Sequence, residues 1–183
     1  MVEIRRYQCK DKDQVRRICM ETAKKGFQHK EVVCWMFLDY YLESEPEHSF
    51  VLVDEEEVVG YIVVSLDKDL YAKQMKEKWI PKIKKYSFIL GWFSKICLRT
   101  TKPLDQKYSG GFHMNITASH QRQGYGRRLL DVMGKHLLLY DKPYLYLITE
   151  NKRTRGHGFY KHYGFQVIKK YFGGALALCY KIK

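Results

Sequence analysis

The hydrophobic pattern of the chain changes its period between residues 112 and 137. Over 112–118, apolar residues alternate with polar ones, and this period of two predicts a strand. Over 129–137, apolar residues recur every three or four positions, which predicts one buried face of a helix. Gly124 and Gly126 fall between the two patterns. We therefore expect a strand, a tight glycine turn and a helix here, with the rest of the chain arranged around them.

The other periodicities predict a mixed domain of strands and helices. Further strands are expected at residues 2–7, 49–53, 58–66, 144–149, 166–168 and 175–182, and helices at 11–24 with Asp11 as its cap, at 31–42, and just before Gly164. Residues 49–66 predict a hairpin with an acidic turn and a bulge near Gly60. Residues 144–149 are apolar on both faces, which is typical of a central strand. Coming after a helix, this strand should run parallel to 112–118 through a right-handed crossover.

A segment of roughly forty residues, Asp67–Ser109, separates the hairpin from the central strand. Its first half is basic and has a helical pattern, while its second half is apolar around Phe88 and Trp92. Pro81 should break or begin a helix there. The segment could pack as an extra core layer, cover a binding site, form a dimer contact or touch a membrane surface.

The charge of the chain bears on its partners. The 183 residues carry a formal net charge of +13, and 45% of them are hydrophobic, enough to supply the core of one substantial domain. The cations are dispersed, and the densest cluster, Lys73–Lys85, fits a solvated helix face as well as a polyanion site. Nucleic acid is therefore a disfavoured partner, whereas electrostatic steering of an anionic ligand is expected.

The cysteines, the first residues and the apolar runs indicate where in the cell the protein is expected. The five cysteines are odd in number and form no Cys-x-x-Cys pair, so we expect neither a disulfide framework nor a metal site. The first residues are charged, so no secretory signal is expected and the cytoplasm is the predicted location. The longest apolar run, 86–98, is shorter than the roughly twenty residues that span a bilayer, and no membrane span is expected.

The glycine turn has the features of an anion site. Glycine lets backbone N–H groups crowd around an anion, and the first turn of a helix adds partial positive charge. Arg122, Arg127 and Arg128 add full charges beside it. A dinucleotide fingerprint would need a third glycine at Leu129, and no Gly-Lys-Ser/Thr follows as a P-loop requires. The expected ligand is a phosphate or pyrophosphate in some other fold.

Two motifs identify that fold by resemblance. Gln121, Gly124 and Gly126 meet the pattern Gln/Arg-x-x-Gly-x-Gly/Ala, and Tyr160, Gly164 and Phe165 meet Tyr-x-x-x-Gly-Phe. Together with the order of elements they resemble the GNAT family of N-acetyltransferases. The resemblance implies an α/β (α+β) fold with a central mixed, mostly antiparallel sheet of six to seven strands, a parallel splayed pair and flanking helices. We expect one such domain over 1–183, with the helical insertion at about 67–109.

The resemblance also implies acetyl-CoA as co-substrate, without a metal. Its pantetheine arm would pair with the backbone of the first splayed strand and its pyrophosphate would sit on the glycine loop. The residues so assigned are Met114, Asn115, Ile116, Gln121, Arg122, Gln123, Gly124, Tyr125, Gly126 and Arg127. The family commonly has a cofactor-binding Asn seven positions before the motif tyrosine. Here that position is Arg153, so either the arginine takes over the contact or Asn151 makes it across an insertion.

The implied reaction is direct attack of an amine on the thioester. Backbone amides near Asn115 and Ile116 would steady the oxyanion, and Tyr160 would donate a proton to the thiolate. An alkyl ammonium has a pKa of ~10.4, so a base must help the attack at neutral pH. Glu150, at the end of the second splayed strand, and His113, on the first, are the two candidates, and water could relay the proton.

Other interpretations remain open at this stage. Glu43, Glu45 and Glu47 around Pro46 are either a solvated turn or a rim that attracts amines. The scaffold could also be an inactive acyl-CoA-binding protein or a basic nucleic-acid-associated module. A homodimer is compatible with the sequence. The acceptor amine does not follow from it, because a fold does not fix a substrate.

Overall fold

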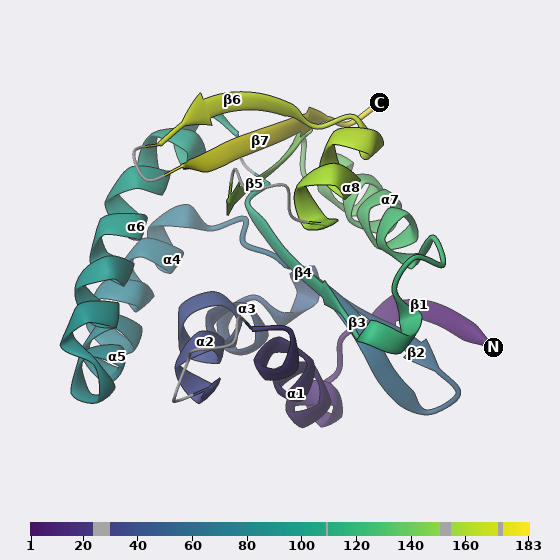
Figure 1. Cartoon of the computed structure of the whole chain (residues 1–183), viewed down its shortest axis with the longest axis horizontal. Coiled ribbons are helices and arrows are strands. Elements are labelled where there is room, and N and C mark those ends of the chain that lie inside the picture. The colour runs from purple at the N-terminus through teal and green to yellow at the C-terminus, as the bar shows by residue number, and fades with distance from the viewer. Residues whose placement is uncertain (24–29, 109, 151–154, 172–173) are drawn as a thin grey trace.

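Seven strands form two sheets within residues 1–23, 30–108, 110–150, 155–171 and 174–183, which the computed structural model describes (Figure 1). The larger sheet is antiparallel, in the order β1 (Val2–Arg6), β2 (Ser49–Asp54), β3 (Glu57–Val64) and β4 (Phe112–Ile116). The smaller is antiparallel in the order β5 (Tyr144–Glu150), β7 (Ala175–Lys181) and β6 (Gln166–Lys170). The predicted hairpin is β2–β3, and its register shifts next to Gly60.

The two sheets meet along the edge strands β4 and β5. They are joined by a parallel bridge between Gly111 and Tyr146, where the amide of Tyr146 donates to the carbonyl of Gly110 at 2.9 Å. A β-carbon at Gly111 would lie 2.7 Å from the Tyr146 hydroxyl, so glycine is needed for this approach. Among the described residues, β4 and β5 make no further backbone pairing beyond this bridge, and the two strands separate towards their carboxyl ends. The predicted parallel splayed pair in a mostly antiparallel arrangement is confirmed.

Helices cover both faces of the larger sheet (Figure 1). On one side lie α1 (Lys12–Thr22), α2 (Lys30–Phe37) and α3 (Asp39–Ser44), and on the other lie α7 (Tyr125–Leu138) and, beside β5, α8 (Arg155–Tyr163). Short 3₁₀ turns are formed by Cys9–Asp11, Pro46–His48 and Ala118–His120. Alternate residues of β2 and β3 point to the two sides: Val51 and Val63 pack with α1 and α2, and Leu52 and Ile62 with α7.

Two local predictions near the N-terminus need correction. Asp11 is the N-cap residue of α1, but its side chain does not cap the helix, because the carboxylate accepts hydrogen bonds from Arg5 at 2.7 Å and from the Gln8 amide at 2.8 Å. The helix expected over 31–42 is broken at Leu38, whose φ of −134° is not helical. The break starts a new helix at Asp39, whose buried carboxylate forms an ion pair with Arg16 of α1.

Most of the described residues of the insertion are helical, including those of its apolar second half. It comprises α4 (Lys68–Gln74), a π-helical turn (Met75–Trp79), α5 (Ile80–Tyr86) and α6 (Phe88–Lys107), with Pro81 in the first turn of α5 as expected. Trp79 and Ile83 are buried against α2 and α3, whereas Leu104 packs with Tyr146 and Cys179 of the smaller sheet. The insertion is therefore an added core layer that contacts both halves of the molecule.

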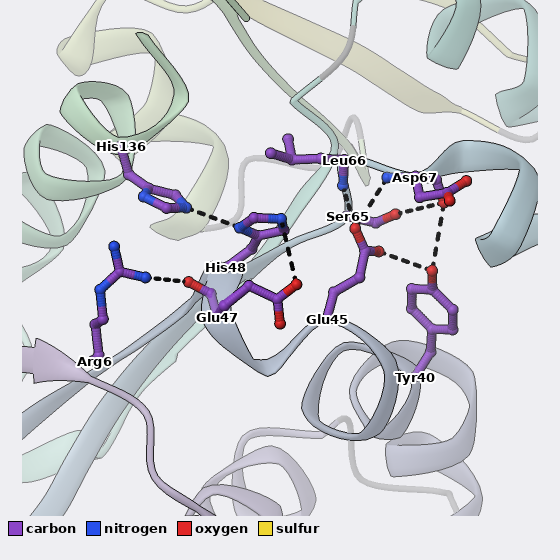
Figure 2. Close-up of polar contacts among 9 residues, drawn as sticks. All are labelled: Arg6, Tyr40, Glu45, Glu47, His48, Ser65, Leu66, Asp67 and His136. Carbon is purple, nitrogen blue, oxygen red and sulfur yellow. Dashed lines mark hydrogen bonds and ion pairs between the residues drawn. The ribbon is translucent and has the colours of Figure 1, made fainter. Parts of the chain in front are cut away.

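Glu45 is neither solvated nor part of a rim, because it is 4% exposed and bonded within the protein (Figure 2). Its carboxylate accepts from the amides of Leu66 at 2.8 Å and Asp67 at 2.9 Å, and from the Tyr40 hydroxyl at 2.8 Å. Those two amides lie where the chain enters the insertion, so Glu45 fixes the root of the insertion. Glu43 also makes structural ion pairs, with Lys12 and Lys78.

Candidate active site

The glycine loop between β4 and α7 has the backbone of an anion cradle. Arg122 and Gly124 have φ values of 63° and 83°, and Gly124 caps the first residue of α7, Tyr125. Among the described residues, no hydrogen bond is donated by the amides of Gly124, Tyr125 or Gly126. A β-carbon at Gly124 would meet no atom within 4 Å, so the space above the loop is open. Unsatisfied helix-start amides beside open space fit a phosphate group.

The loop's glutamines act on the loop itself. The Gln121 amide group donates to the carbonyl of Ile116 at 2.9 Å, and that of Gln123 donates to the carbonyl of Ser119 at 2.8 Å. Gln121 therefore holds the loop against the end of β4, and Gln123 holds it against the 3₁₀ turn that follows β4. Gln121 and Gln123 therefore contribute to ligand binding indirectly, because their side chains maintain the backbone conformation of the loop.

Aromatic rings orient the arginines beside the loop. The Arg127 guanidinium lies over the Tyr163 ring, 5.1 Å from its centroid, and that of Arg128 lies 5.4 Å from the centroid of Tyr125. Arg122 is exposed at the tip. These contacts keep positive charge at the start of α7, where an anion would bind.

Gly126 brings the two motifs together. A β-carbon there would lie 3.0 Å from the ring of Phe159, the residue before Tyr160 on α8. The glycine thus permits close packing of α7 against the helix that carries the motif tyrosine. Gly164, with φ of 118°, then ends α8, and the Phe165 amide donates to the carbonyl of Tyr160 at 3.0 Å.

Tyr160 is buried beside the start of β4. Its ring packs against Phe112, Phe159 and Phe165, with centroids 5.9, 5.2 and 5.3 Å away. Within the described structure its hydroxyl makes no hydrogen bond. Burial raises the pKa of the Tyr160 phenol, so the group keeps its proton at neutral pH.

The opposite side of β4 carries a polar network that sequence reasoning missed in part. The Tyr61 hydroxyl lies 3.1 Å from Nδ1 of His113 and accepts from the Asn115 side chain at 2.9 Å. The His113 ring stacks on Phe37 of α2, with centroids 5.7 Å apart. Tyr61 could have been found only from the strand register, which pairs it with Asn115.

Burial sets the protonation of this network. It lowers the pKa of His113 to about 4, because the imidazolium would lose its hydration, and it raises the pKa of Tyr61. Both groups are therefore neutral at neutral pH. Since neighbouring residues of a strand point to opposite faces, His113 and the Phe112–Tyr160 contact lie on opposite sides of β4.

Of the remaining residues assigned from the sequence, the structure describes some completely and others in part or not at all. Met114 and Ile116 pack towards the core shared with α7, so β4 offers a ligand its backbone edge at these positions. Glu150 is the last residue of β5, and its side chain lies outside the described part. Asn151 and Arg153 also lie outside the described residues. In the described part of the chain no three His, Cys, Asp or Glu side chains are placed to hold a metal ion.

Comparisons with known proteins agree with this geometry. The model of the acetyltransferase (GNAT) family matches residues 12–165. The solved structure of SsHAT is 24% identical, with a TM-score of 0.87 over 100% of this chain and 98% of that one. A chain of the NatC complex, solved with Gag peptide and CoA, is 12% identical, with a TM-score of 0.62 over 100% and 99% of the two chains. Polyamine N-acetyltransferase of Drosophila melanogaster, which forms N-acetylagmatine, is 11% identical, with a TM-score of 0.68 over 99% and 100%.

Proposed function

Since the chain belongs to the GNAT family of acetyltransferases, we propose that it moves the acetyl group of acetyl-CoA to a primary amine of a small molecule or peptide. The observation that carries the proposal is the joint geometry of the splay and the loop. β4 and β5 part towards their carboxyl ends, and the open anion cradle follows directly from the end of β4. The likeness to a CoA-bound structure supports acetyl-CoA as the donor, and the likeness to a polyamine acetyltransferase supports an amine as the acceptor.

The long, anionic thioester substrate fits two features of this chain. The amides of Gly124 to Gly126 bind its pyrophosphate, with charge from Arg122 and Arg127. The edge of β4 that faces the splay pairs with its amide-containing arm, as an added strand would. Asn151 or Arg153 supplies a further contact, and no metal takes part.

The transfer needs one bond made and one broken. The amine's lone pair attacks the carbonyl carbon and forms the C–N bond, and the C–S bond then breaks with its electron pair left on sulfur. Backbone amides near Asn115 and Ile116 donate to the carbonyl oxygen while it is anionic. Tyr160, which burial keeps protonated, donates to the leaving thiolate.

The amine's proton passes to a base on the other side of β4. His113 is neutral at neutral pH, and its Nδ1 faces Tyr61, so Nε2 is the nitrogen left to meet an acceptor. The low pKa of His113 makes it a weak base. It therefore takes up the proton only when negative charge develops next to the ring during the reaction. Glu150, at the end of β5, is the alternative base.

The test is an acceptor panel read by free CoA thiol and by product mass. Polyamines, agmatine, amino acids and peptides with free N-termini are each incubated with acetyl-CoA and the protein. Thiol release that depends on one amine, with an acetyl group gained by that amine, supports the proposal. Binding of acetyl-CoA without release on any amine would overturn the transferase proposal and favour an acyl-CoA-binding protein.

A further inference from the structure

The hairpin of α5 and α6 exposes an unusual amount of apolar side chain at its tip. We call five residues the aromatic tip: Tyr86, Phe88, Ile89, Trp92 and Phe93, which are 53, 73, 74, 58 and 48% exposed. They are contiguous along the end of α5 and the first turns of α6. Clustered exposure of large apolar side chains marks an interaction surface in soluble proteins.

The tip is supported by packing, so its exposure is not that of a frayed end. Ile83 and Ser94 are buried on the inner faces of the two helices. A β-carbon at Gly91 would lie 2.2 Å from Cγ of Lys84, so the helices approach closely there. The outward residues are thus held in place by the inward ones. In Figure 1 the hairpin lies at the side of the molecule away from α7, α8 and the glycine loop.

The charge around the tip has one sign. From residue 78 to residue 104 the sequence has seven Lys and Arg residues and no Asp or Glu. All seven of these cations are exposed: Lys78, Lys82, Lys84, Lys85, Lys95, Arg99 and Lys102. The Lys84 ammonium lies 6.0 Å from the centroid of Phe88, so cations stand directly beside the aromatic tip.

We propose that the α5–α6 hairpin docks the protein on an anionic lipid surface, with the aromatic tip in the interface and the surrounding cations on lipid head groups. Trp and Phe side chains favour the boundary between head groups and acyl chains, and Lys and Arg near a leaflet are attracted by anionic lipids. Among the described helices none is long and apolar enough to cross a bilayer, so the hairpin lies on the surface.

Two other occupants fit the surface less well. A symmetric dimer built on the tip would bring two copies of its cations towards each other, which costs free energy in the absence of acidic partners. Nucleic acid could use the charge and the rings. However, Ile89 is as exposed as Phe88 and offers nothing to stack on a base.

The test is binding to vesicles of phosphatidylcholine alone and of phosphatidylcholine with phosphatidylglycerol, followed by sedimentation and by tryptophan emission. Trp35 and Trp79 are 4% and 1% exposed, so a blue shift on adding vesicles reports chiefly on Trp92. We expect sedimentation and a blue shift with the anionic vesicles only, both weakened by salt. Absence of binding to them, or equal binding to the neutral ones, would overturn the proposal.

Matched variants assign binding to the tip. Phe88→Ser with Ile89→Ser should weaken vesicle binding by at least about tenfold, because both side chains lose their apolar burial. Lys84→Glu with Lys85→Glu should do the same through charge. Leu139→Ser, at a position 78% exposed at the end of α7, is the control and should bind as the wild type does. Vesicle binding unchanged in both tip variants would refute the assignment. So would a dimer, or a nucleic acid complex, that the tip variants abolish while lipid binding persists.

Discussion

Acidification should destabilise the fold through two histidines that the folded protein keeps neutral, His113 and His136. Burial lowers the pKa of both His113 and His136 to about 4, whereas an unfolded chain restores a value near 6.5. His136 is 4% exposed, and its Nε2 lies 3.0 Å from Nδ1 of His48, so a second proton has no place between the rings (Figure 2). Between pH 6.5 and 4 the unfolded state therefore binds more protons than the native state.

The sign and the size follow from those values. The free energy of unfolding is fully retained above pH 6.5 and falls as the pH drops towards 4. Linkage gives a loss of about 2 kcal/mol per histidine at pH 5 relative to pH 8, and about 3 kcal/mol once the pH is below 4. Two such groups can remove a large part of the stability of a domain of this size.

Urea unfolding between pH 8 and pH 5 at fixed ionic strength measures this dependence. His136→Gln keeps an amide near the position of Nε2 but does not titrate, so its stability should fall with pH less steeply than that of the wild type, by about 2 kcal/mol at pH 5. His162→Gln, at an exposed position, is the control and should follow the wild type. Parallel curves of stability against pH for the wild type and His136→Gln would show that His136 does not contribute to the loss of stability in acid.

Three further predictions concern the reaction and the root of the insertion. Tyr160→Phe should lower kcat by ~10²–10⁴-fold while the Kd for acetyl-CoA changes only a few fold, which rapid-quench kinetics and calorimetry would separate; full kcat when chemistry limits the rate would remove Tyr160 from the mechanism. His113→Gln should lower kcat/KM for the amine without weakening acetyl-CoA binding, whereas Tyr61→Phe should have a smaller effect of the same kind; equal kcat/KM in His113→Gln would leave Glu150 or water as the base. Glu45→Ala should lower the free energy of unfolding by about 2–4 kcal/mol, because two buried amides lose their acceptor. Glu47→Ala, on an exposed side chain, should stay within about 0.5 kcal/mol of the wild type, and equal losses would contradict the role of Glu45.

The parts of the fold that sequence could predict are those with strong local signals. The change of period at Gly124 placed β4 and α7, and the alternation of apolar residues placed the β2–β3 hairpin. Gly124 and Gly164 both have positive φ, which only a few residue types adopt readily, so their motifs had a local physical basis. The parallel direction of the two strands followed from the order of strand, helix and strand, whereas their splay was implied by the resemblance to the family.

What sequence could not predict depends on contacts between distant segments. In the sequence, Glu45 stands beside two other glutamates and could be solvated. In the structure its carboxylate accepts hydrogen bonds from backbone amides about twenty residues away. In the sequence, Tyr61 is one position in an apolar strand pattern. Only the pairing of β3 with β4 shows that its hydroxyl lies between His113 and Asn115. The helical periodicity of 31–42 likewise does not show the break at Leu38, next to which Asp39 pairs with Arg16 of a different helix.

Calorimetric titration of acetyl-CoA into the wild type and Gly124→Val tests whether the glycine loop binds the pyrophosphate of acetyl-CoA. The valine puts a branched side chain into the open space over the loop and is strained at φ of 83°, so it should abolish binding while the fold persists. Gly174→Val, at φ of 86° in a glycine far along the chain from the loop, controls for backbone strain and should keep the wild-type affinity. We expect acetyl-CoA to bind the wild type and Gly174→Val, and binding to be lost in Gly124→Val alone. Unchanged affinity in Gly124→Val would contradict the cofactor site and, with it, the proposed transfer.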